Sequence, residues 1–283
     1  GTPVHLIKDL FHSTESPIAM PDGSVLFTEQ DNGDGRIVRI GLDDGISTFV
    51  DNTNRTIGLA YDTKGRLVAA ESHLGRIGVL SPTKQTLVDT VDGLPVVSPN
   101  DLVADRKGGI YFTDPYQVGA QKKPEDLPQA IYYISPDGKK VTQMITDIAR
   151  PNGITLSANG KILYANDWDG AYLLTYDVQS DGTLKNRKNW GKYTVKQETD
   201  HGLVSGADGL CVDSKGDAFA TTPAGVQVFN SKGEHLADIE APYDMPPQNC
   251  GFGGPGYGYL YVTGRGVVYR IKTLTAGIKN QGK

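Results

Sequence analysis

Short stretches of alternating hydrophobic and polar residues recur along the whole chain, and each ends at a turn that contains glycine, asparagine or aspartate. Over its first hundred residues they read VLFTE, RIVRI and STFV, then RLVAA, RIGVL and QTLVDTV. Alternation with a period of two, broken by NG, DG and KG pairs, is typical of half-buried β-strands joined by hairpins. No segment has a helical period over a useful length. The chain is therefore predicted to be all-β.

One position recurs six times, at or just before the beginning of a strand. The repeats lie about 40 to 55 residues apart, which is the size of one propeller blade. They begin at Glu15, Ile57, Asn100, Asn152, Asp208 and Asn249. A turn and a second strand follow each of them, in order VLFTE, RLVAA, GIYFTD, KILYAN, DAFATT and YLYVTG. These units occupy the whole chain, so we predict a single domain, residues 1–283, folded as a six-bladed β-propeller.

The two ends of the chain indicate how the ring closes. The sixth unit ends near Ile271 and lacks one strand, whereas VHLIKDL at residues 4–10 is a spare strand. We expect this N-terminal strand to complete the last blade, because it would close the ring and cover a sheet edge. Residues 272–283 show no strand pattern and are expected to form a loose tail.

In a closed ring the equivalent positions of the blades converge on one axis. Four of the six carry oxygen donors that are expected to meet there: Glu15, Asn100, Asn152 and Asp208. Calcium takes six to eight oxygen ligands, so four side chains would leave positions for water and substrate. The set has no cysteine or histidine pair of the kind that zinc and copper prefer. We predict one axial divalent cation, Ca²⁺ before Zn²⁺, Mn²⁺ or Mg²⁺.

The same residues have a simpler interpretation when each is taken alone. Asn152-Gly and Asp208-Gly are common turn pairs, and Glu15 alone would be a surface acid. Ile57 breaks the series and is expected to pack against its neighbours. The recurrence of oxygen donors at equivalent positions is what favours a metal site.

Loops that follow the second strand of each blade are expected to surround the axis on the same face. Candidate substrate contacts on this face are Asn100, Tyr116, Trp168, His73, His201 and Asn249. The two histidines could equally serve loop structure. Two segments, residues 116–129 and 190–206, are longer than a blade needs, and long loops at a site are usually functional. The first is a candidate lid.

Charge and composition argue against several classes of partner. The formal net charge is −5 and the isoelectric point about 5.5, with no block of Lys or Arg, which disfavours nucleic acid and anionic membranes. Cys211 and Cys250 follow two neighbouring axial positions and are expected to lie near each other, as free thiols rather than as a disulfide. The compartment, cytoplasmic or exported after removal of a leader, and the oligomeric state are left open.

Several blade segments resemble the family of gluconolactonase, regucalcin and luciferin-regenerating enzyme. They are ESPIAMPDGSVLFTE, SPNDLVADRKGGIYFTDPY, RPNGITLSANGKILYAND and ADGLCVDSKGDAFAT, and the likeness runs from about Glu15 to Tyr269. The resemblance implies a six-bladed propeller whose axial divalent cation, commonly calcium, serves lactone hydrolysis. It implies that Glu15, Asn152 and Asp208 are metal ligands, with Asn100 a ligand or substrate contact and Asp208 also the acid/base. Ser98 stands where many sugar lactonases carry arginine.

The leading hypothesis is therefore a metal-dependent lactonase acting on a small-molecule lactone, a sugar lactone or a related one. Its cation would polarise the carbonyl while Asp208 assists the attack of water. One alternative is phosphotriester hydrolysis at the same site. The other is a non-catalytic propeller in which the ion only holds the blades together at the axis and the loops bind a partner.

Overall fold

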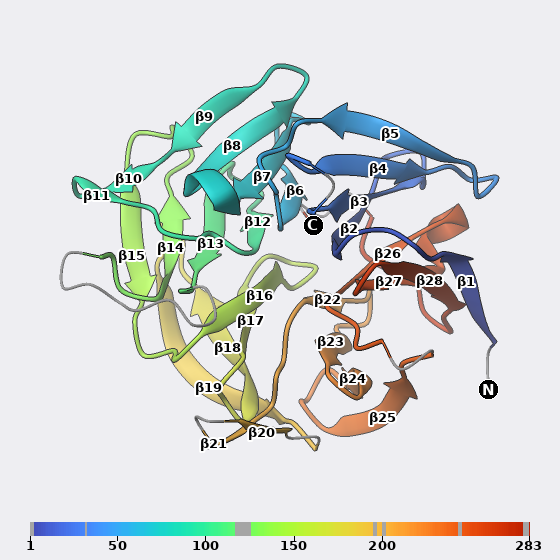
Figure 1. Ribbon diagram of the computed structural model, residues 1–283. Helices are drawn as coiled ribbons and strands as arrows, with labels where there is room; N and C mark the ends of the chain where they lie inside the picture. Colours follow the sequence, from blue (N-terminus) through green and yellow to red (C-terminus); the bar gives the residue numbers. More distant parts are fainter. Residues whose placement is uncertain are drawn as a thin grey trace.

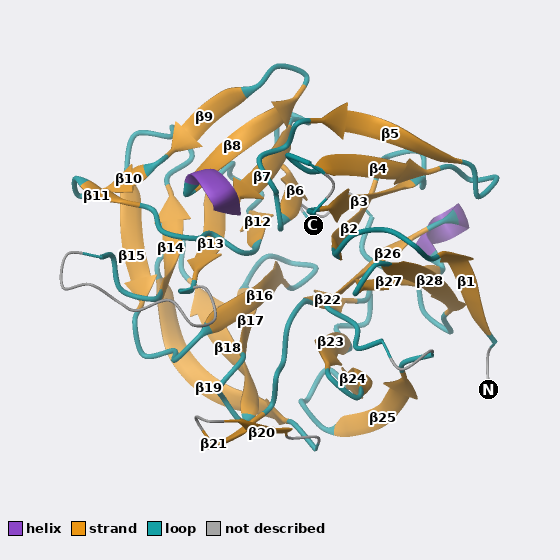
Figure 2. Ribbon diagram, in the orientation of Figure 1, coloured by secondary structure: helices purple, strands orange, loops and turns teal. Residues whose placement is uncertain are grey.

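The computed structural model describes residues 3–31, 33–116, 126–194, 197–199, 202–242, 245–279 and 283. Over these residues the strands form six four-stranded antiparallel sheets around a central axis (Figure 1). The only helical segments in the described ranges are two 3-10 turns, η1 (Ser72–Leu74) and η2 (Pro255–Tyr257) (Figure 2). The predicted six-bladed, all-β propeller is confirmed. None of the helical segments described is long and apolar enough to span a membrane.

The first five blades each consist of four strands that are consecutive in the chain. Blade one holds β2 (Thr14–Ala19), β3 (Val25–Glu29), β4 (Arg36–Ile40) and β5 (Ile46–Asp51). Blade two holds β6 (Leu59–Tyr61), β7 (Leu67–Glu71), β8 (Arg76–Ser81) and β9 (Gln85–Val88). Blade three holds β12 (Leu102–Ala104), β13 (Ile110–Asp114), β14 (Ala130–Ile134) and β15 (Val141–Ile145). Blade four holds β16 (Pro151–Leu156), β17 (Ile162–Asp167), β18 (Tyr172–Val178) and β19 (Leu184–Lys192). Blade five holds β22 (Leu210–Val212), β23 (Ala218–Thr222), β24 (Gly225–Phe229) and β25 (His235–Glu240).

Blade six is built from both ends of the chain. It holds β26 (Asn249–Gly253), β27 (Tyr259–Gly264), β28 (Val267–Lys272) and β1 (Val4–Lys8), with β1 on the outer edge. The N-terminal strand pairs antiparallel with β28, so that Val4 lies opposite Ile271 (Figure 1). The predicted closure of the ring by the N-terminal strand is confirmed.

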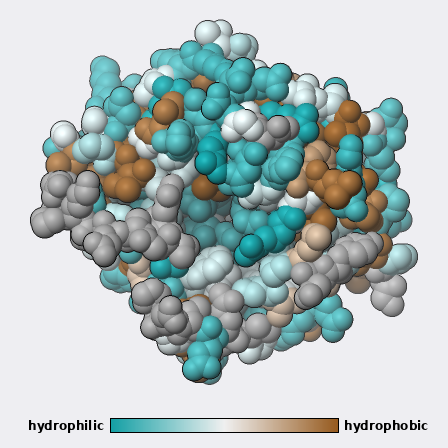
Figure 3. Space-filling model, viewed as in Figure 1, coloured by the Kyte–Doolittle hydropathy of each residue, from teal (hydrophilic) through white to brown (hydrophobic). Residues whose placement is uncertain are grey.

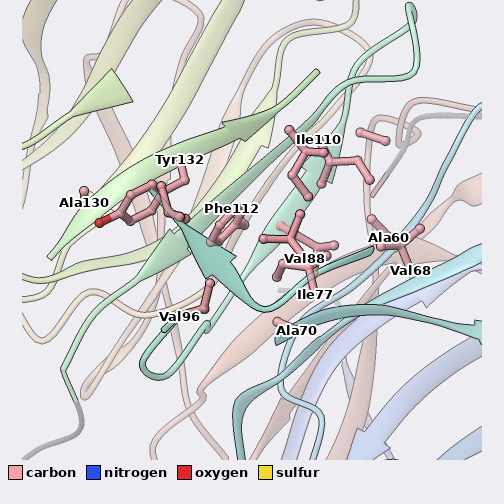
Figure 4. Packing of buried hydrophobic residues seen from close by; sticks show 14 of the residues in the cluster. Ala60, Val68, Ala70, Ile77, Val88, Val96, Ile110, Phe112, Ala130 and Tyr132 are labelled. Atoms are coloured by element: carbon pink, nitrogen blue, oxygen red, sulfur yellow. The ribbon is translucent and has the colours of Figure 1, made fainter. Parts of the chain in front are cut away.

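Apolar side chains fill the spaces between neighbouring blades. The cluster between blades two and three includes Ala60, Val68 and Ile77 on one side and Ile110, Phe112 and Tyr132 on the other (Figure 4). The rings of Phe112 and Tyr132 stack with their centroids 5.3 Å apart. Because each blade packs against a neighbour on both faces, the second strands β3, β7 and β13 are buried over their whole length. This packing holds the axial ends of the strands in place.

Two short hairpins lie between blades. They are β10 (Thr90–Val91) with β11 (Leu94–Pro95), and β20 (Gln197–Thr199) with β21 (Gly202–Val204). The long segment expected at residues 190–206 is therefore only partly a loop, because its first residues belong to β19 and later ones to the second hairpin.

The expectation of a loose C-terminal tail is wrong for the residues described. The backbone N–H of Ser214 donates to the carbonyl of Ala276 (2.9 Å), and that of Gly277 donates to the carbonyl of Tyr257 (2.9 Å). A Cβ atom at Gly277 would lie 2.1 Å from the Cβ of Phe252, so glycine is what lets the tail pack this closely. Farther on, the ammonium of Lys283 pairs with Asp101 inside the ring, where its side chain is only 3% exposed. The C label of Figure 1 lies at the centre of the ring.

Candidate functional site

The expected axial residues lie at the same end of the ring, where the innermost strands begin. Glu15, Asn152 and Asn249 lie within β2, β16 and β26, and Asp208 lies two residues before β22. All four are buried, whereas Asn100, two residues before β12, is only partly buried. In the view from the side of η1, hydrophilic residues surround a hollow at the centre of this face (Figure 3).

Side-chain contacts connect most of this set. Asp208 is hydrogen-bonded to Asn152, and Glu15 is hydrogen-bonded to Asn249. The Nε2 of Gln248 also donates to Oε1 of Glu15 (3.1 Å). The structure therefore brings together three of the four predicted oxygen donors, Glu15, Asn152 and Asp208, and adds the predicted substrate contact Asn249 and Gln248 to them. The backbone of Asn100 is fixed by a hydrogen bond from its N–H to the carbonyl of Thr113 (2.9 Å).

The surroundings of the two buried acids disfavour their charged forms. Burial raises the pKa of Glu15 to about 7, and the nearby Asp101 carboxyl contributes. Burial also raises the pKa of Asp208 well above its usual range, with Glu15 and Asp101 adding to the shift. Lys283 acts in the opposite direction on both acids. A further cation between these carboxyls would favour their charged forms.

The donor chemistry fits a hard divalent cation. The candidate set offers carboxylate and amide oxygens, the ligands that Ca²⁺ and Mg²⁺ take. In the described ranges no three His, Cys, Asp or Glu side chains form a metal-binding group.

Four hydrogen bonds between neighbouring blades fix the backbone of axial residues. The side chain of one second-strand residue in each of four blades donates to an axial backbone carbonyl of the next blade. These bonds run from Thr28 to Ile57 (3.2 Å), Thr113 to Asn152 (2.8 Å), Asn166 to Asp208 (2.6 Å) and Thr221 to Gln248 (2.8 Å). The bonds tie blades one to two, three to four, four to five and five to six at the site.

Sequence reasoning did not find these four residues as a set. The signal was present, because they occupy one shared position in the aligned second strands VLFTE, GIYFTD, KILYAN and DAFATT. Their small polar side chains in otherwise apolar strands are the feature to look for, since a buried hydroxyl or amide requires a partner.

The residue that follows this position is an acid in several blades, and it holds the loop that leads to the axis. Asp114 accepts the N–H groups of Val97 (2.9 Å) and Ser98 (2.7 Å). Asp167 likewise accepts the N–H groups of Ala149 (3.1 Å) and Arg150 (2.9 Å). These carboxylates lie on the predicted face, but they orient backbone.

Glycine after an axial residue permits neighbouring strands to approach closely. A Cβ atom at Gly209 would lie 2.2 Å from Oδ1 of Asn249, and one at Gly153 would lie 2.4 Å from the carbonyl oxygen of Asp208. The N–H of Gly153 donates to that same carbonyl (3.0 Å). The interpretation of Asn152-Gly and Asp208-Gly as turn pairs is therefore wrong, because the glycines serve packing around the axis.

The predicted substrate contacts on this face differ in their surroundings. The hydroxyl of Tyr116 donates to the carbonyl of Leu127 (2.5 Å), so it anchors the end of the candidate lid. Trp168 is half-buried, and its carbonyl accepts the N–H of Gly206 (3.0 Å). His73 is exposed on η1. His201 and most of the candidate lid, residues 117–125, lie outside the described residues, so their roles stay predictions.

Residues 13–265 match the family described as "SMP-30/Gluconolactonase/LRE-like region". A gluconolactonase of Zymomonas mobilis subsp. mobilis is 27% identical over an alignment that spans 98% of this chain and 83% of that protein. Lactonase drp35 of Staphylococcus saprophyticus is 32% identical, over 50% of this chain and 42% of its own length.

Solved structures show the same architecture. A gluconolactonase from Xanthomonas campestris superposes with a TM-score of 0.83 at 25% identity, covering 96% of this chain and 89% of that chain. A calcium-binding protein, regucalcin, from Agrobacterium tumefaciens has a TM-score of 0.78 at 16% identity, covering 98% of this chain and 95% of that one. The second likeness concerns the fold alone.

Proposed function

The chain belongs to the SMP-30/gluconolactonase/LRE-like family, and we propose that it is a divalent-metal-dependent lactonase. Relatives named gluconolactonase and lactonase support lactone hydrolysis as the reaction. The observation that carries the metal-dependent part is the pair of buried acids, Glu15 and Asp208, each bonded to an amide at the axis. The substrate is a small-molecule lactone, either a sugar lactone or a related one.

Glu15, Asn100, Asn152 and Asp208 would hold the cation, with Ca²⁺ the best match to their oxygen atoms. When bound, the cation supplies Lewis-acid polarisation of the lactone carbonyl. The two carboxylates match its charge, and the two amides add oxygen atoms without adding charge. Gln248 and Asn249 orient the Glu15 carboxylate through their hydrogen bonds.

Asp208 is the proposed acid/base. Its carboxylate would take a proton from the water that attacks the carbonyl carbon, and would return that proton to the ring oxygen as the ring C–O bond breaks. The products are a carboxylic acid and an alcohol in one open chain. The hydrogen bonds that the Asn166 side chain and the Gly153 N–H donate to the Asp208 carbonyl fix the main chain from which the Asp208 side chain projects.

The proposed substrate contacts are Asn100, Asn249, Tyr116, Trp168, His73 and His201. The hydroxyl of Tyr116 already bonds the carbonyl of Leu127, so we propose that its ring is the part that lines the pocket. Ser98 bonds through its hydroxyl to Ser72 (2.8 Å) and brings no positive charge to this position. Neutral lactones should therefore be compared with acidic ones.

The proposal is tested by hydrolysis assays on a broad lactone panel, after metal removal and re-addition of Ca²⁺, Zn²⁺, Mn²⁺ or Mg²⁺ one at a time. A phosphotriester panel is run beside it. Turnover of lactones that requires an added cation is the expected result. Turnover of phosphotriesters alone would support the rival hydrolysis, and no turnover of either class would support a non-catalytic propeller.

Asp208→Asn tests the role of the acid/base. The substitution keeps the size and one coordinating oxygen but removes the charge and the ability to accept a proton. General acid–base assistance is worth ~10²–10⁴-fold, so we expect kcat to fall by about that factor even at saturating metal. Asn152→Asp is the matched control, because it adds charge at the axis without removing a base. Full kcat for Asp208→Asn at saturating metal would make Asp208 a ligand only.

A further inference from the structure

Two cysteines lie side by side at the axis and take no part in the proposed mechanism. Cys211 belongs to β22 and Cys250 to β26, the innermost strands of blades five and six. Their Sγ atoms are 3.4 Å apart, and both are free thiols, as the sequence predicted. The Sγ of Cys250 also contacts the carbonyl oxygen of Phe219 (3.3 Å). The pair is preformed, since neither strand has to separate from its blade for the sulfur atoms to meet.

A cavity gives access to this pair from the face opposite the candidate metal site. Its volume is about 400 Å³, and its lining includes both cysteines together with Pro17, Tyr61 and Leu156. Cys211 is 7% exposed and Cys250 is fully buried. A molecule in the cavity would therefore meet Cys211 before Cys250.

We propose that Cys211 and Cys250 form a reversible dithiol–disulfide site that reacts with small peroxides or organic disulfides entering this cavity. With an organic disulfide, the Cys211 sulfur attacks one sulfur of the reagent and releases the first thiol. The Cys250 sulfur then attacks the Cys211 sulfur and releases the second thiol. The protein loses two protons and two electrons, and the reagent gains them. With hydrogen peroxide, the same balance yields two molecules of water.

The position of the pair connects it to the candidate metal site. Cys211 comes three residues after Asp208, and Cys250 directly follows Asn249. A disulfide has an S–S length of about 2.05 Å, so its formation would draw together the two strands that carry these residues. The side chain of Asn249 already packs against Gly209, which leaves little room for the approach. Oxidation should therefore displace Asp208 or Asn249 slightly.

The first experiment treats the folded, metal-loaded protein with dithiodipyridine and follows thiopyridone release and intact mass. Burial raises the pKa of the Cys211 thiol, so the reaction is followed for hours. We expect one equivalent of reagent consumed, two of thiopyridone released, a protein lighter by two hydrogen atoms, and a Cys211–Cys250 linked peptide that disappears with dithiothreitol. Separate adducts on the two cysteines, or reaction only at the rate of global unfolding, would overturn the proposal.

Variants of one cysteine at a time separate the first attack, by Cys211, from the second attack, by Cys250. Cys250→Ser should keep the thiopyridyl group on Cys211 as a stable mixed disulfide, while Cys211→Ser should be unreactive in the folded state. Circular dichroism shows whether each variant is folded, and Cys→Ala replaces any that is not. Reactive Cys211→Ser, while folded, would contradict the proposed order of attack.

The effect on catalysis rests on the proposed function, whereas disulfide formation is measured by mass and does not. A ~1 Å misplacement in an active site can cost ~10²-fold, so we expect kcat/KM on the best lactone to fall about tenfold or more. Dithiothreitol should restore it, and Cys211→Ser should show no change with oxidant. Unchanged activity in fully oxidised protein would refute the link to the site and leave the dithiol chemistry standing.

Discussion

Asn166→Ala is expected to destabilise the ring and to disturb the site at once. Asn166 is fully buried in β17, and its Nδ2 donates to the carbonyls of Asp208 (2.6 Å) and Gly209 (3.2 Å). Its Oδ1 accepts the hydroxyl of Tyr193 (2.5 Å), itself buried. One side chain thus connects a tyrosine of the outer part of blade four with the backbone of the proposed acid/base in blade five.

The loss of stability expected for Asn166→Ala follows from the hydrogen bonds that the substitution removes. Alanine removes three hydrogen bonds, each worth about 1 kcal/mol net, and leaves the buried hydroxyl of Tyr193 without this acceptor, at about 1–3 kcal/mol. The carbonyl of Asp208 keeps the N–H of Gly153 as a donor, which limits the loss. We therefore expect the free energy of unfolding to fall by about 3–5 kcal/mol. Tyr193→Phe removes only the last bond and should lose about 1–2 kcal/mol.

Urea unfolding of the metal-loaded variants measures both values, and lactone kinetics measure the effect on the site. The double variant Asn166→Ala/Tyr193→Phe should be less destabilised than the sum of the single variants by about 1 kcal/mol, because the two residues share one bond. A free energy of unfolding for Asn166→Ala within 1 kcal/mol of the parent value, with kcat/KM unchanged, would refute the reasoning.

Three further predictions concern the ion, the buried acids and the packing at the axis. Chelation should abolish activity and lower Tm together, because the cation binds only the folded ring; activity that survives metal removal verified by elemental analysis would end the metal hypothesis. In chelator, Tm should be highest near pH 5 and fall as the pH rises through 7, because folding raises the pKa of Glu15 from 4.5 to about 7 and the folded protein then holds a proton that the unfolded chain releases. A cation should remove the part of this fall that comes from Glu15, and a flat profile without metal would contradict it. Gly209→Ala should cost about 1–3 kcal/mol or more, because its Cβ would meet Asn249, whereas Gly258→Ala, with its nearest contact at 3.5 Å, should unfold like the parent protein.

The repeated pattern predicted the blades because each blade uses the same alternation and the same turn. It also predicted where Glu15, Asn152, Asp208 and Asn249 lie, since equivalent positions of a ring must share one end of the axis. What the pattern could not predict were contacts between units, such as the bond from Asn166 to the backbone of Asp208. Such contacts depend on how two blades stack, which no single repeat encodes.

The C-terminal residues 272–283 show a second limit of prediction from the sequence. The described residues of this tail make specific contacts, such as the pairing of Gly277 with Asp213 and of Lys283 with Asp101. Neither a hydrophobic period nor a turn signal marks them, so the segment resembled a loop. For the same reason the glycines after Asn152 and Asp208 suggested turns, although their role depends on atoms of the neighbouring strand.

The pairing of β1 with β28 also determines when the ring can be completed during synthesis. Val4 and Ile271 are opposite each other in the last blade, so β1 has to wait until the chain has been made as far as β28. At about 5–20 residues per second, that wait lasts roughly 13–50 s. Closing so long a loop costs about 5 kcal/mol by the logarithmic rule, and such non-local pairing is slow. β1 suits this wait, because VHLIK carries polar residues and stays largely exposed even in the finished blade, so it offers little apolar surface to a wrong partner.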